Sequence, residues 1–538
     1  MSLAPAPRVE ALAPRTAADA VRGRTGASAT LDRDVASSAT GWRLAVGAVM
    51  LVALVARLIG VNGGLWIDEI YSLVRSFRVP MAAILTEYWG DNHHPLYAVL
   101  AHLSRAAFGE APWTIRLPAV LFGVAAIPAL FALGAQVASR REALLASLLL
   151  AVSYHHVWFS QNARGYSAIA CLAIVTMWAL VRGVDTGRTR YFVWYGVAAG
   201  LGAYTHLTMI LVVVGHALGA VAYMAAPGRP IDRRALLRGG LVAFGLAAVV
   251  TLALYAPMLR EVIDFFLGHK SGLQGVSTPR WAALETIRIL VLGLGAGLAV
   301  VGGAVVAAGI VVGVSGIAAL WNTHRLFVLM LAGACVATVA GAAAARGTMY
   351  PRFFFFAIGP AMLVAVRGAY AACGALASRL GRPALGPRVA MGGVSAVIVL
   401  SAASLSFDYR YPKQDFEGAM RFVLAERRSD DGVVSTGLPT DPYRMLYGQD
   451  WPVLSTRAEL DSARRANART WVLWTFPRYL EKYAPEIDRV LQSDCEDKRV
   501  FRGTVGGGDV LVCFLPRVEG TVAPGSAQVA PPVPAQSQ

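Results

Sequence analysis

The sequence predicts an α-helical, polytopic membrane protein with a small α/β domain near its C-terminal end. Hydrophobic residues make up 56% of the 538 residues and charged residues only 15%, against about 45–50% and about 25% in ordinary soluble domains. The chain also contains a series of apolar runs, each near the roughly 20 residues that a helix needs to cross a bilayer. Together these observations exclude an ordinary soluble enzyme.

The apolar runs predict about eleven transmembrane helices, and thirteen at most. They lie at residues 43–62, 116–137, 141–158, 165–182, 190–205, 207–226, 236–257, 289–313, 325–345, 350–373 and 388–405. A further apolar run at 94–108 has the length of a re-entrant or interfacial helix. Counting it as a span would invert every loop that follows.

Arginines set the predicted orientation, because Lys and Arg concentrate in cytoplasmic loops. They are dense in the predicted loops 138–142, 182–190, 228–238 and 378–388. We therefore expect a cytoplasmic N-terminus, a first outer loop at 63–114 and an exported C-terminal domain. The net charge of +16 belongs to these loops and the N-terminal arm, where topology explains it. Nucleic-acid binding is not expected.

The predicted domains follow changes in composition along the chain. Residues 1–42 are expected to form a disordered cytoplasmic arm and 517–538 a disordered tail, because both are low-complexity segments. Residues 43–405 form the membrane domain. Residues 406–516 read as a small α/β domain with helices at 415–428, 457–467 and 477–492, strands at 433–436 and 470–476, and a final hairpin closed by Gly506–Gly508.

Two cysteines, Cys495 and Cys513, flank this predicted hairpin. In an oxidising exterior compartment they can close a disulfide. The alternative is a pair of unpaired thiols.

Adjacent carboxylates follow the first span in the stretch GLWIDEIYS, at Asp68 and Glu69. One interpretation is that they cap the next helix, since acids favour helix N-termini. The same loop supports a functional interpretation, because its stretch WGDNHHPLY adds His93, His94 and Tyr97. Acids, imidazoles and aromatic rings are thus predicted to gather on one side of the membrane.

Cations are predicted on the same side, in three other outward turns. Arg164 and Arg352 each stand at the mouth of an apolar span, and a third turn contributes His269 and Lys270. Ionisable groups are costly in such places and suggest function, although a snorkelling side chain is the alternative for each. Guanidinium and ammonium groups are what a phosphate or diphosphate at the membrane surface requires.

The chain resembles the GT-C superfamily of membrane glycosyltransferases, in particular bacterial relatives of protein O-mannosyltransferases and aminoarabinose transferases. The resemblance covers about residues 43–405 and rests on these motifs: DE (68–69), HHPLY (93–97), IRLPAVLFG (115–123), SQNARGY (160–166), AYTH (203–206) and YPRFF (350–354). It implies transfer of a sugar from a polyprenyl-phosphate donor at the outer face of a bacterial inner membrane, with a periplasmic C-terminal domain. Asp68 matches the family's catalytic base.

Two departures from the family pattern affect the site. His94 stands before Pro95 where the family often has His-Pro-Pro-Leu-Tyr, and Asn162 replaces the acid of the common SQEAR motif. The second departure removes the usual acidic neighbour of Arg164.

The residues support this chemistry independently of the family. A carboxylate such as Asp68 can take the proton of an attacking hydroxyl, and Arg352, Lys270 and Arg164 can stabilise a departing lipid phosphate. Glu69 would orient one of these three cations or hold an acceptor, while His93, His94, Tyr97 and His269 would help to bind the donor.

No cofactor and no metal ion are expected, because no spacing in the sequence resembles a metal motif. The predicted partners are a polyprenyl-phosphate sugar, membrane lipid and an acceptor that is a protein, lipid A, a glycan or another lipid. The alternatives are an oligosaccharide ligase that uses a lipid diphosphate, and a transporter or flippase. A transporter would place charges at mid-membrane, whereas the polar groups here cluster in outer loops.

Overall fold

A computed structural model describes residues 39–90, 92–226, 232–268, 302–344, 350–438 and 440–518. The predicted arm up to residue 38 and the predicted tail from residue 519 lie outside these ranges. The chain divides into a unit of residues 1–48 and a second unit that begins at Val49 and contains all later elements. The contacts reported below lie within this second unit.

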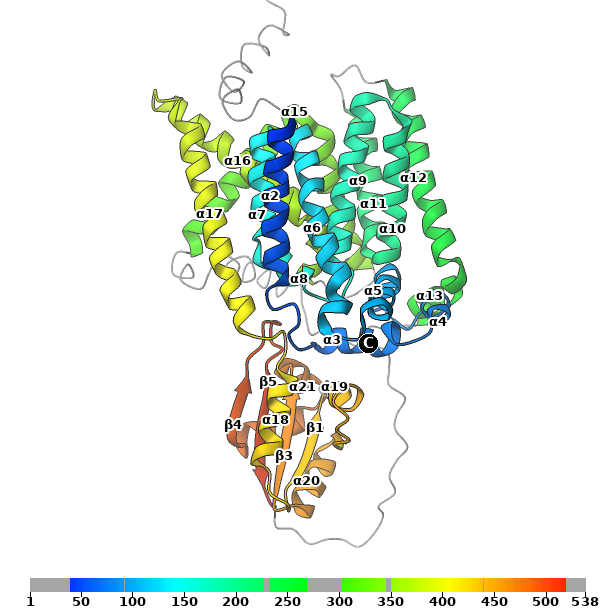
Figure 1. Ribbon diagram of the computed structural model, residues 1–538, viewed down its shortest axis with the longest axis vertical. Coiled ribbons are helices and arrows are strands. Elements are labelled where there is room, and N and C mark those ends of the chain that lie inside the picture. The colour runs from blue at the N-terminus through cyan, green and yellow to red at the C-terminus, as the bar shows by residue number, and fades with distance from the viewer. Residues whose placement is uncertain are drawn as a thin grey trace, which may run out of the picture. The chain divides into compact units, whose positions relative to one another are not determined.

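Helices form most of the described chain before residue 411 (Figure 1). They are α2 (Ala39–Leu58), α3 (Ile67–Ser72), a π-helical turn η1 (Leu73–Phe77), α4 (Met81–Thr86), α5 (Pro95–Phe108), α6 (Pro112–Val137), α7 (Arg140–Ala151), α8 (Tyr154–Ser160), α9 (Tyr166–Thr186), α10 (Thr189–Thr205), α11 (Thr208–Ala225), α12 (Arg233–Tyr255), η2 (Ala256–Met258), α13 (Leu259–Gly268), α15 (Gly302–Ala344), η4 (Pro351–Ala357), α16 (Ile358–Arg379) and α17 (Leu385–Arg410).

Eight helices of the described residues are long and apolar enough to cross a membrane, or nine if α7 and α8, bent by 59° at their junction, form one broken span. This differs from the eleven predicted spans for two reasons. Helix α10 has only 17 residues. Helix α15 has 43 residues with one non-helical position at His324, so the two runs predicted at 289–313 and 325–345 meet in one kinked helix. Residues 289–301 lie outside the described ranges.

Helix α15 counts as one candidate span, and it is longer than one crossing requires. At 1.5 Å per residue, 43 residues extend about 65 Å, roughly twice the thickness of a hydrocarbon core. Helix α5 has only 14 residues and extends about 21 Å, which is too short to span. The run at 94–108 is therefore a short helix of the first outer loop.

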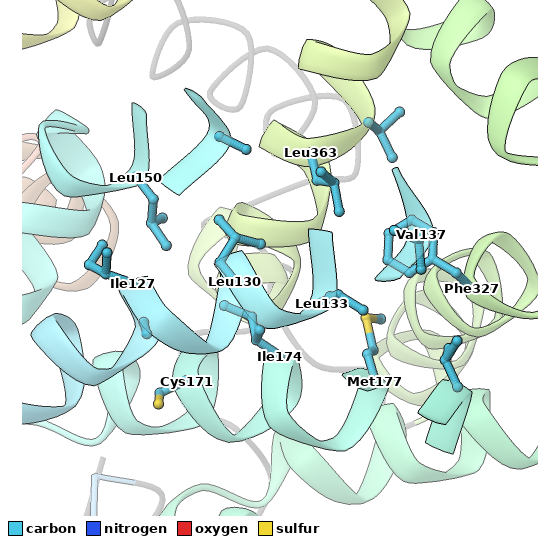
Figure 2. Packing of buried hydrophobic residues seen from close by; sticks show 14 of the residues in the cluster. Ile127, Leu130, Leu133, Val137, Leu150, Cys171, Ile174, Met177, Phe327 and Leu363 are labelled. Atoms are coloured by element: carbon cyan, nitrogen blue, oxygen red, sulfur yellow. The ribbon is translucent and has the colours of Figure 1, made fainter. Parts of the chain in front are cut away.

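The membrane domain is held together by an apolar core around α6. Ile127, Leu130 and Leu133 of this helix are fully buried, and they belong to one cluster with Ile174 of α9 and Leu363 of α16. Figure 2 shows these side chains with their neighbours from α7 and α15.

Helices α11 and α15 approach each other closely at glycines. A Cβ atom at Gly215 would collide with the backbone of Gly333 and Ala334, and one at Gly219 would lie 2.8 Å from the backbone of Leu329. Small residues let transmembrane backbones come this close.

The C-terminal domain is a five-stranded mixed sheet in the order β2-β1-β3-β5-β4. Its elements are α18 (Phe416–Glu426), β1 (Gly432–Thr436), α19 (Thr440–Met445), β2 (Val453–Leu454), α20 (Arg457–Ala466), β3 (Arg469–Thr475), α21 (Pro477–Tyr483), α22 (Pro485–Ser493), β4 (Glu496–Phe501) and β5 (Val510–Pro516). Strands β2, β1 and β3 are parallel, and β5 is antiparallel to β3 and β4.

Alternating side chains of the central strands build one core on each face of this sheet. Trp471 and Leu473 of β3 pack on one side with Phe416 of α18, while Val472 and Trp474 pack on the other with residues of α20, α21 and α22. The predicted order of helices and strands agrees with these elements. The predicted helix 477–492 is broken into α21 and α22 before Pro485, and α19 and β2 were not predicted.

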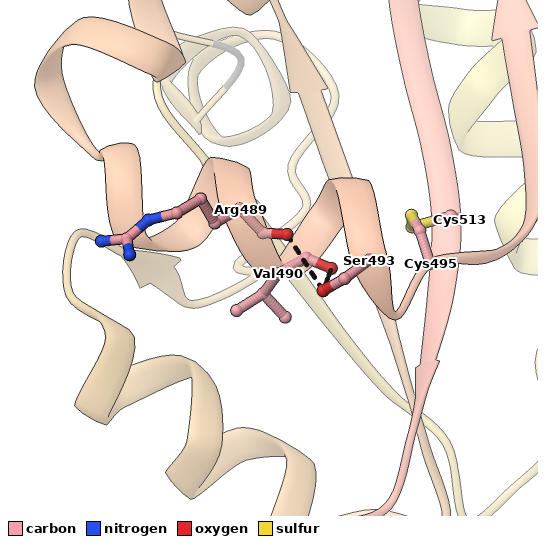
Figure 3. The surroundings of a disulfide bond; sticks show 5 residues. All are labelled: Arg489, Val490, Ser493, Cys495 and Cys513. Atoms are coloured by element: carbon pink, nitrogen blue, oxygen red, sulfur yellow. Dashed lines mark hydrogen bonds between the residues drawn. A yellow bond between two sulfur atoms is a disulfide. The ribbon is translucent and has the colours of Figure 1, made fainter.

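The structure joins Cys495 to Cys513 by a disulfide, with their Cα atoms 5.8 Å apart (Figure 3). Cys513 lies in β5 and is fully buried, while Cys495 follows α22. The bond therefore connects the end of a helix to an inner strand of the sheet.

Candidate active site

The two adjacent acids of the first outer loop have different surroundings. Glu69 is completely buried, and each of its oxygens accepts two hydrogen bonds. Oε1 accepts from Arg116 Nε at 2.8 Å and from the Ala163 amide at 2.7 Å. Oε2 accepts from Arg116 Nη2 at 2.6 Å and from the Trp66 amide at 3.3 Å. A carboxylate offers about four such positions, so Glu69 has none left for a substrate.

Arg116, near the start of α6, is satisfied as completely as Glu69. Its three donors that do not bond Glu69 reach the carbonyl oxygens of Val61, Gly63 and Gly64 at 2.8–2.9 Å. Burial alone would raise the pKa of Glu69, but the charge and hydrogen bonds of Arg116, with the nearby charge of Lys413, hold that pKa below its ordinary value. The pair thus stays ionised and fixes the loop that enters α3.

Asp68, on the other side of the same turn, is 22% exposed and lies between two arginines. Its Oδ2 is 3.5 Å from Nη1 of Arg164 and 3.8 Å from Nη1 of Arg352. Both distances exceed those of charge-assisted hydrogen bonds. Asp68 is therefore held by charge without being enclosed.

The turn after α8 carries Arg164 into this position. The Asn162 side chain accepts a hydrogen bond from Trp66 Nε1 at 3.0 Å, and the next amide, that of Ala163, donates to Glu69. Arg164 is only 3% exposed, yet its Nε and Nη1 atoms have no hydrogen-bond partner. A buried guanidinium with free donors is suited to an anionic ligand.

Imidazole rings line the buried side of the site. His94 is 4% exposed and neither of its ring nitrogens has a hydrogen-bond partner. Its ring lies 4.8 Å from that of His206 and 5.6 Å from that of Tyr166. Gly165 makes room for it, since a Cβ there would lie 2.9 Å from His94 Nδ1.

Both histidines of the HHPLY stretch are kept neutral by their surroundings. Burial lowers the pKa of His93 to about 4. Burial, assisted by the charge of Arg164, also lowers the pKa of His94 well below its ordinary value. A neutral imidazole offers one donor and one acceptor, which suits sugar hydroxyls.

Residues 92–259 match the model of the dolichyl-phosphate-mannose-protein mannosyltransferase family. The fold is similar to that of an Archaeoglobus fulgidus oligosaccharyltransferase crystallised with Zn and sulfate, with a TM-score of 0.50 and 13% identity over 86% of this chain and 72% of that one. The family match thus covers part of the chain, and the structural similarity shows a common fold.

A second GT-C structure is that of ArnT from Cupriavidus metallidurans bound to undecaprenyl phosphate. It gives a TM-score of 0.49 at 14% identity and covers 88% of this chain and 98% of that one. No curated protein sequence matches the chain.

The structure brings together Asp68, Arg164, Arg352 and His94, as the sequence predicted. Tyr97 does not join them, because its hydroxyl donates to the Ile115 carbonyl at 2.7 Å inside the loop core. His269 and Lys270 lie outside the described residues. Glu69 orients a cation, which was one of its two predicted roles, but that cation is Arg116.

Three residues next to this site had no predicted role: Arg116, Lys413 and Gln414. Arg116 could have been found by the reasoning applied to Arg164, since it too is an arginine at the mouth of an apolar helix. Lys413 and Gln414 lie in the segment that enters the C-terminal domain, and no pattern in the sequence connects them to Asp68.

Among the described residues, no three His, Cys, Asp or Glu side chains are grouped closely enough to hold a metal ion. The expectation that the reaction needs no metal remains a prediction.

Proposed function

We propose that this protein moves a sugar from a polyprenyl-phosphate donor to the hydroxyl of an acceptor, with Asp68 as the general base. One observation carries the proposal: Asp68 is accessible and loosely paired to two arginines, whereas Glu69 beside it is saturated. An accessible carboxylate can accept the proton of an attacking hydroxyl, and the arginines are placed to bind a phosphate.

The reaction forms one bond and breaks another. The acceptor oxygen bonds to the anomeric carbon of the sugar as the bond from that carbon to the phosphate oxygen breaks, which inverts the configuration. The hydroxyl proton passes to Asp68, and the electron pair of the broken bond leaves with the lipid phosphate. Arg164 and Arg352 offset the charge that develops on this phosphate, and such fixed cations are most effective where water is scarce.

Further residues complete the proposed donor site. His93 and His94 would bind sugar hydroxyls, and Lys270 and His269 would add a second phosphate contact from the outer loop that contains them. Arg352, at 34% exposure, would contact the lipid phosphate. We place the site at the outer face of a bacterial inner membrane, with the C-terminal domain in the periplasm.

The test is transfer by the purified protein from a panel of polyprenyl-monophosphate and polyprenyl-diphosphate sugars. Asp68→Asn should lower turnover by about 10²–10⁴-fold, the usual contribution of a positioned base. Glu110→Gln is the matched control, because Glu110 is an acid of the same loop that pairs with Arg78 at the surface. Undiminished transfer by Asp68→Asn would disprove the assignment, and activity with diphosphates alone would favour an oligosaccharide ligase.

A further inference from the structure

A single glutamine connects the C-terminal sheet to the helix that carries Asp68. Gln414 is 2% exposed, and its Oε1 accepts a hydrogen bond from the Ile67 amide at 3.0 Å. Its Nε2 donates to the Gly508 carbonyl at 3.0 Å and to Thr475 Oγ1 at 3.3 Å. Ile67 is the first residue of α3 and directly precedes Asp68, so this side chain fixes the start of that helix.

A second connection reaches the helix that leads to Arg164. Trp158 Nε1, in α8, donates to Thr504 Oγ1 at 2.8 Å, and the Lys413 ammonium lies 4.8 Å from the centre of the Trp158 ring. Thr504 belongs to the loop between β4 and β5, whose amides at 504 and 505 donate to the carbonyls of Pro412 and Lys413. The same loop that contacts Gln414 therefore also contacts α8.

The two connections are surrounded by one continuous apolar cluster. Trp66, Ile67 and Ile70 of the outer loop are buried together with Phe416 and Tyr443 of the C-terminal domain. A joint of this kind resists small displacements, because packed interiors have little free volume.

We propose that the C-terminal domain positions the catalytic groups, with Gln414 holding the helix of Asp68 and Thr504 holding the helix that leads to Arg164. This inference rests on the proposed function of Asp68 and Arg164. Gln414 and Thr504 are positioning residues, because neither touches the reacting atoms. They affect the position of the proposed base, Asp68, and of the proposed phosphate clamp, Arg164 and Arg352. A displacement of 1 Å in a catalytic group costs about 10²-fold in rate.

The test compares two isosteric variants, Gln414→Met and Thr504→Val, with a control in the same domain. The control is Thr436→Val, since the buried Thr436 hydroxyl donates only to the Leu454 carbonyl at 2.8 Å, within the sheet. Turnover is expressed per molecule able to bind polyprenyl phosphate, which corrects for unfolded protein. Melting temperatures are measured for all variants.

We expect Gln414→Met to lower kcat by about 10–100-fold, with the KM for the donor changed by less than about threefold. Thr504→Val should lower kcat by a smaller factor. Hydrogen exchange should become faster in the peptide of residues 66–72 for Gln414→Met. Thr436→Val should lower the melting temperature but leave kcat within about twofold of wild type.

Wild-type kcat in Gln414→Met, or an equal loss of kcat in Thr436→Val, would overturn the positioning role. Failure of the underlying function gives a different result, since Asp68→Asn would then transfer sugar as fast as the wild type.

Discussion

The adjacent acids Asp68 and Glu69 form two arginine–carboxylate sites with opposite properties. Glu69 and Arg116 are 0% and 2% exposed and satisfy each other and the surrounding backbone completely. Asp68 is 22% exposed, and its two arginines lie at 3.5 and 3.8 Å. The same residue types thus build a structural pair on one side of the turn and a reactive group on the other.

The difference indicates that free hydrogen-bonding capacity, more than residue type, separates the proposed catalytic carboxylate from the structural one. The two sites are also linked. Glu69 accepts from the Ala163 amide, one residue before Arg164, so the saturated site holds the turn that supplies a cation to the open site.

The largest expected effect comes from breaking the saturated pair. Glu69→Gln leaves Arg116 buried with an uncompensated charge, and we expect a loss of about 3–5 kcal/mol in the free energy of unfolding. Denaturant or thermal unfolding in detergent measures it. Asp68→Asn should change the unfolding free energy by less than about 0.5 kcal/mol. Equal destabilisation by the two substitutions would remove the distinction between the sites.

Removing a cation from the open site should affect turnover and leave stability nearly unchanged. Arg164→Gln is expected to lower kcat by about 10²-fold, as the loss of one fixed charge-stabilising group does. Arg105→Gln is a suitable control, because Arg105 pairs with Glu110 at the loop surface. Turnover in Arg164→Gln within a factor of about two of wild type would exclude Arg164 from the phosphate clamp.

Acid should lower the free energy of unfolding through protonation linked to His93. The pKa of His93 is about 4 in the folded chain and ordinary, about 6.5, in the unfolded chain. As the pH falls from 6.5 to 4 only the unfolded chain takes up this proton, so stability decreases over that window by about 1–3 kcal/mol. Melting temperatures of wild type and His93→Gln measure this loss, which should be smaller in the variant. Identical pH profiles would contradict the burial of a neutral His93.

The smallest effect is expected from restoring the acid of the family pattern. Asn162→Asp keeps the acceptor for Trp66 Nε1 and gives Arg164 a second carboxylate neighbour. Competition for the guanidinium should lower turnover by less than about tenfold, with no change in donor preference. Higher turnover in this variant would show that Arg164 is better placed by two acids than by Asp68 alone.

The sequence predicted the membrane helices, the order of elements in the C-terminal domain and the meeting of Asp68, Arg164 and Arg352. It could not show that Glu69 is saturated, because the groups that saturate it come from Arg116 and Ala163, which are 47 and 94 positions away. The link from Gln414 to Ile67 spans 347 positions and was equally hidden. Apolar runs also could not show that α15 continues as a helix to either side of His324.

The glycine contact between α11 and α15 limits how this protein can change shape. Two helices whose main chains touch at Gly215 and Gly333 cannot slide along each other without raising one backbone over the other. We therefore expect α11 and α15 to keep fixed positions relative to each other. Any opening between helices must involve helices that meet through deformable side chains.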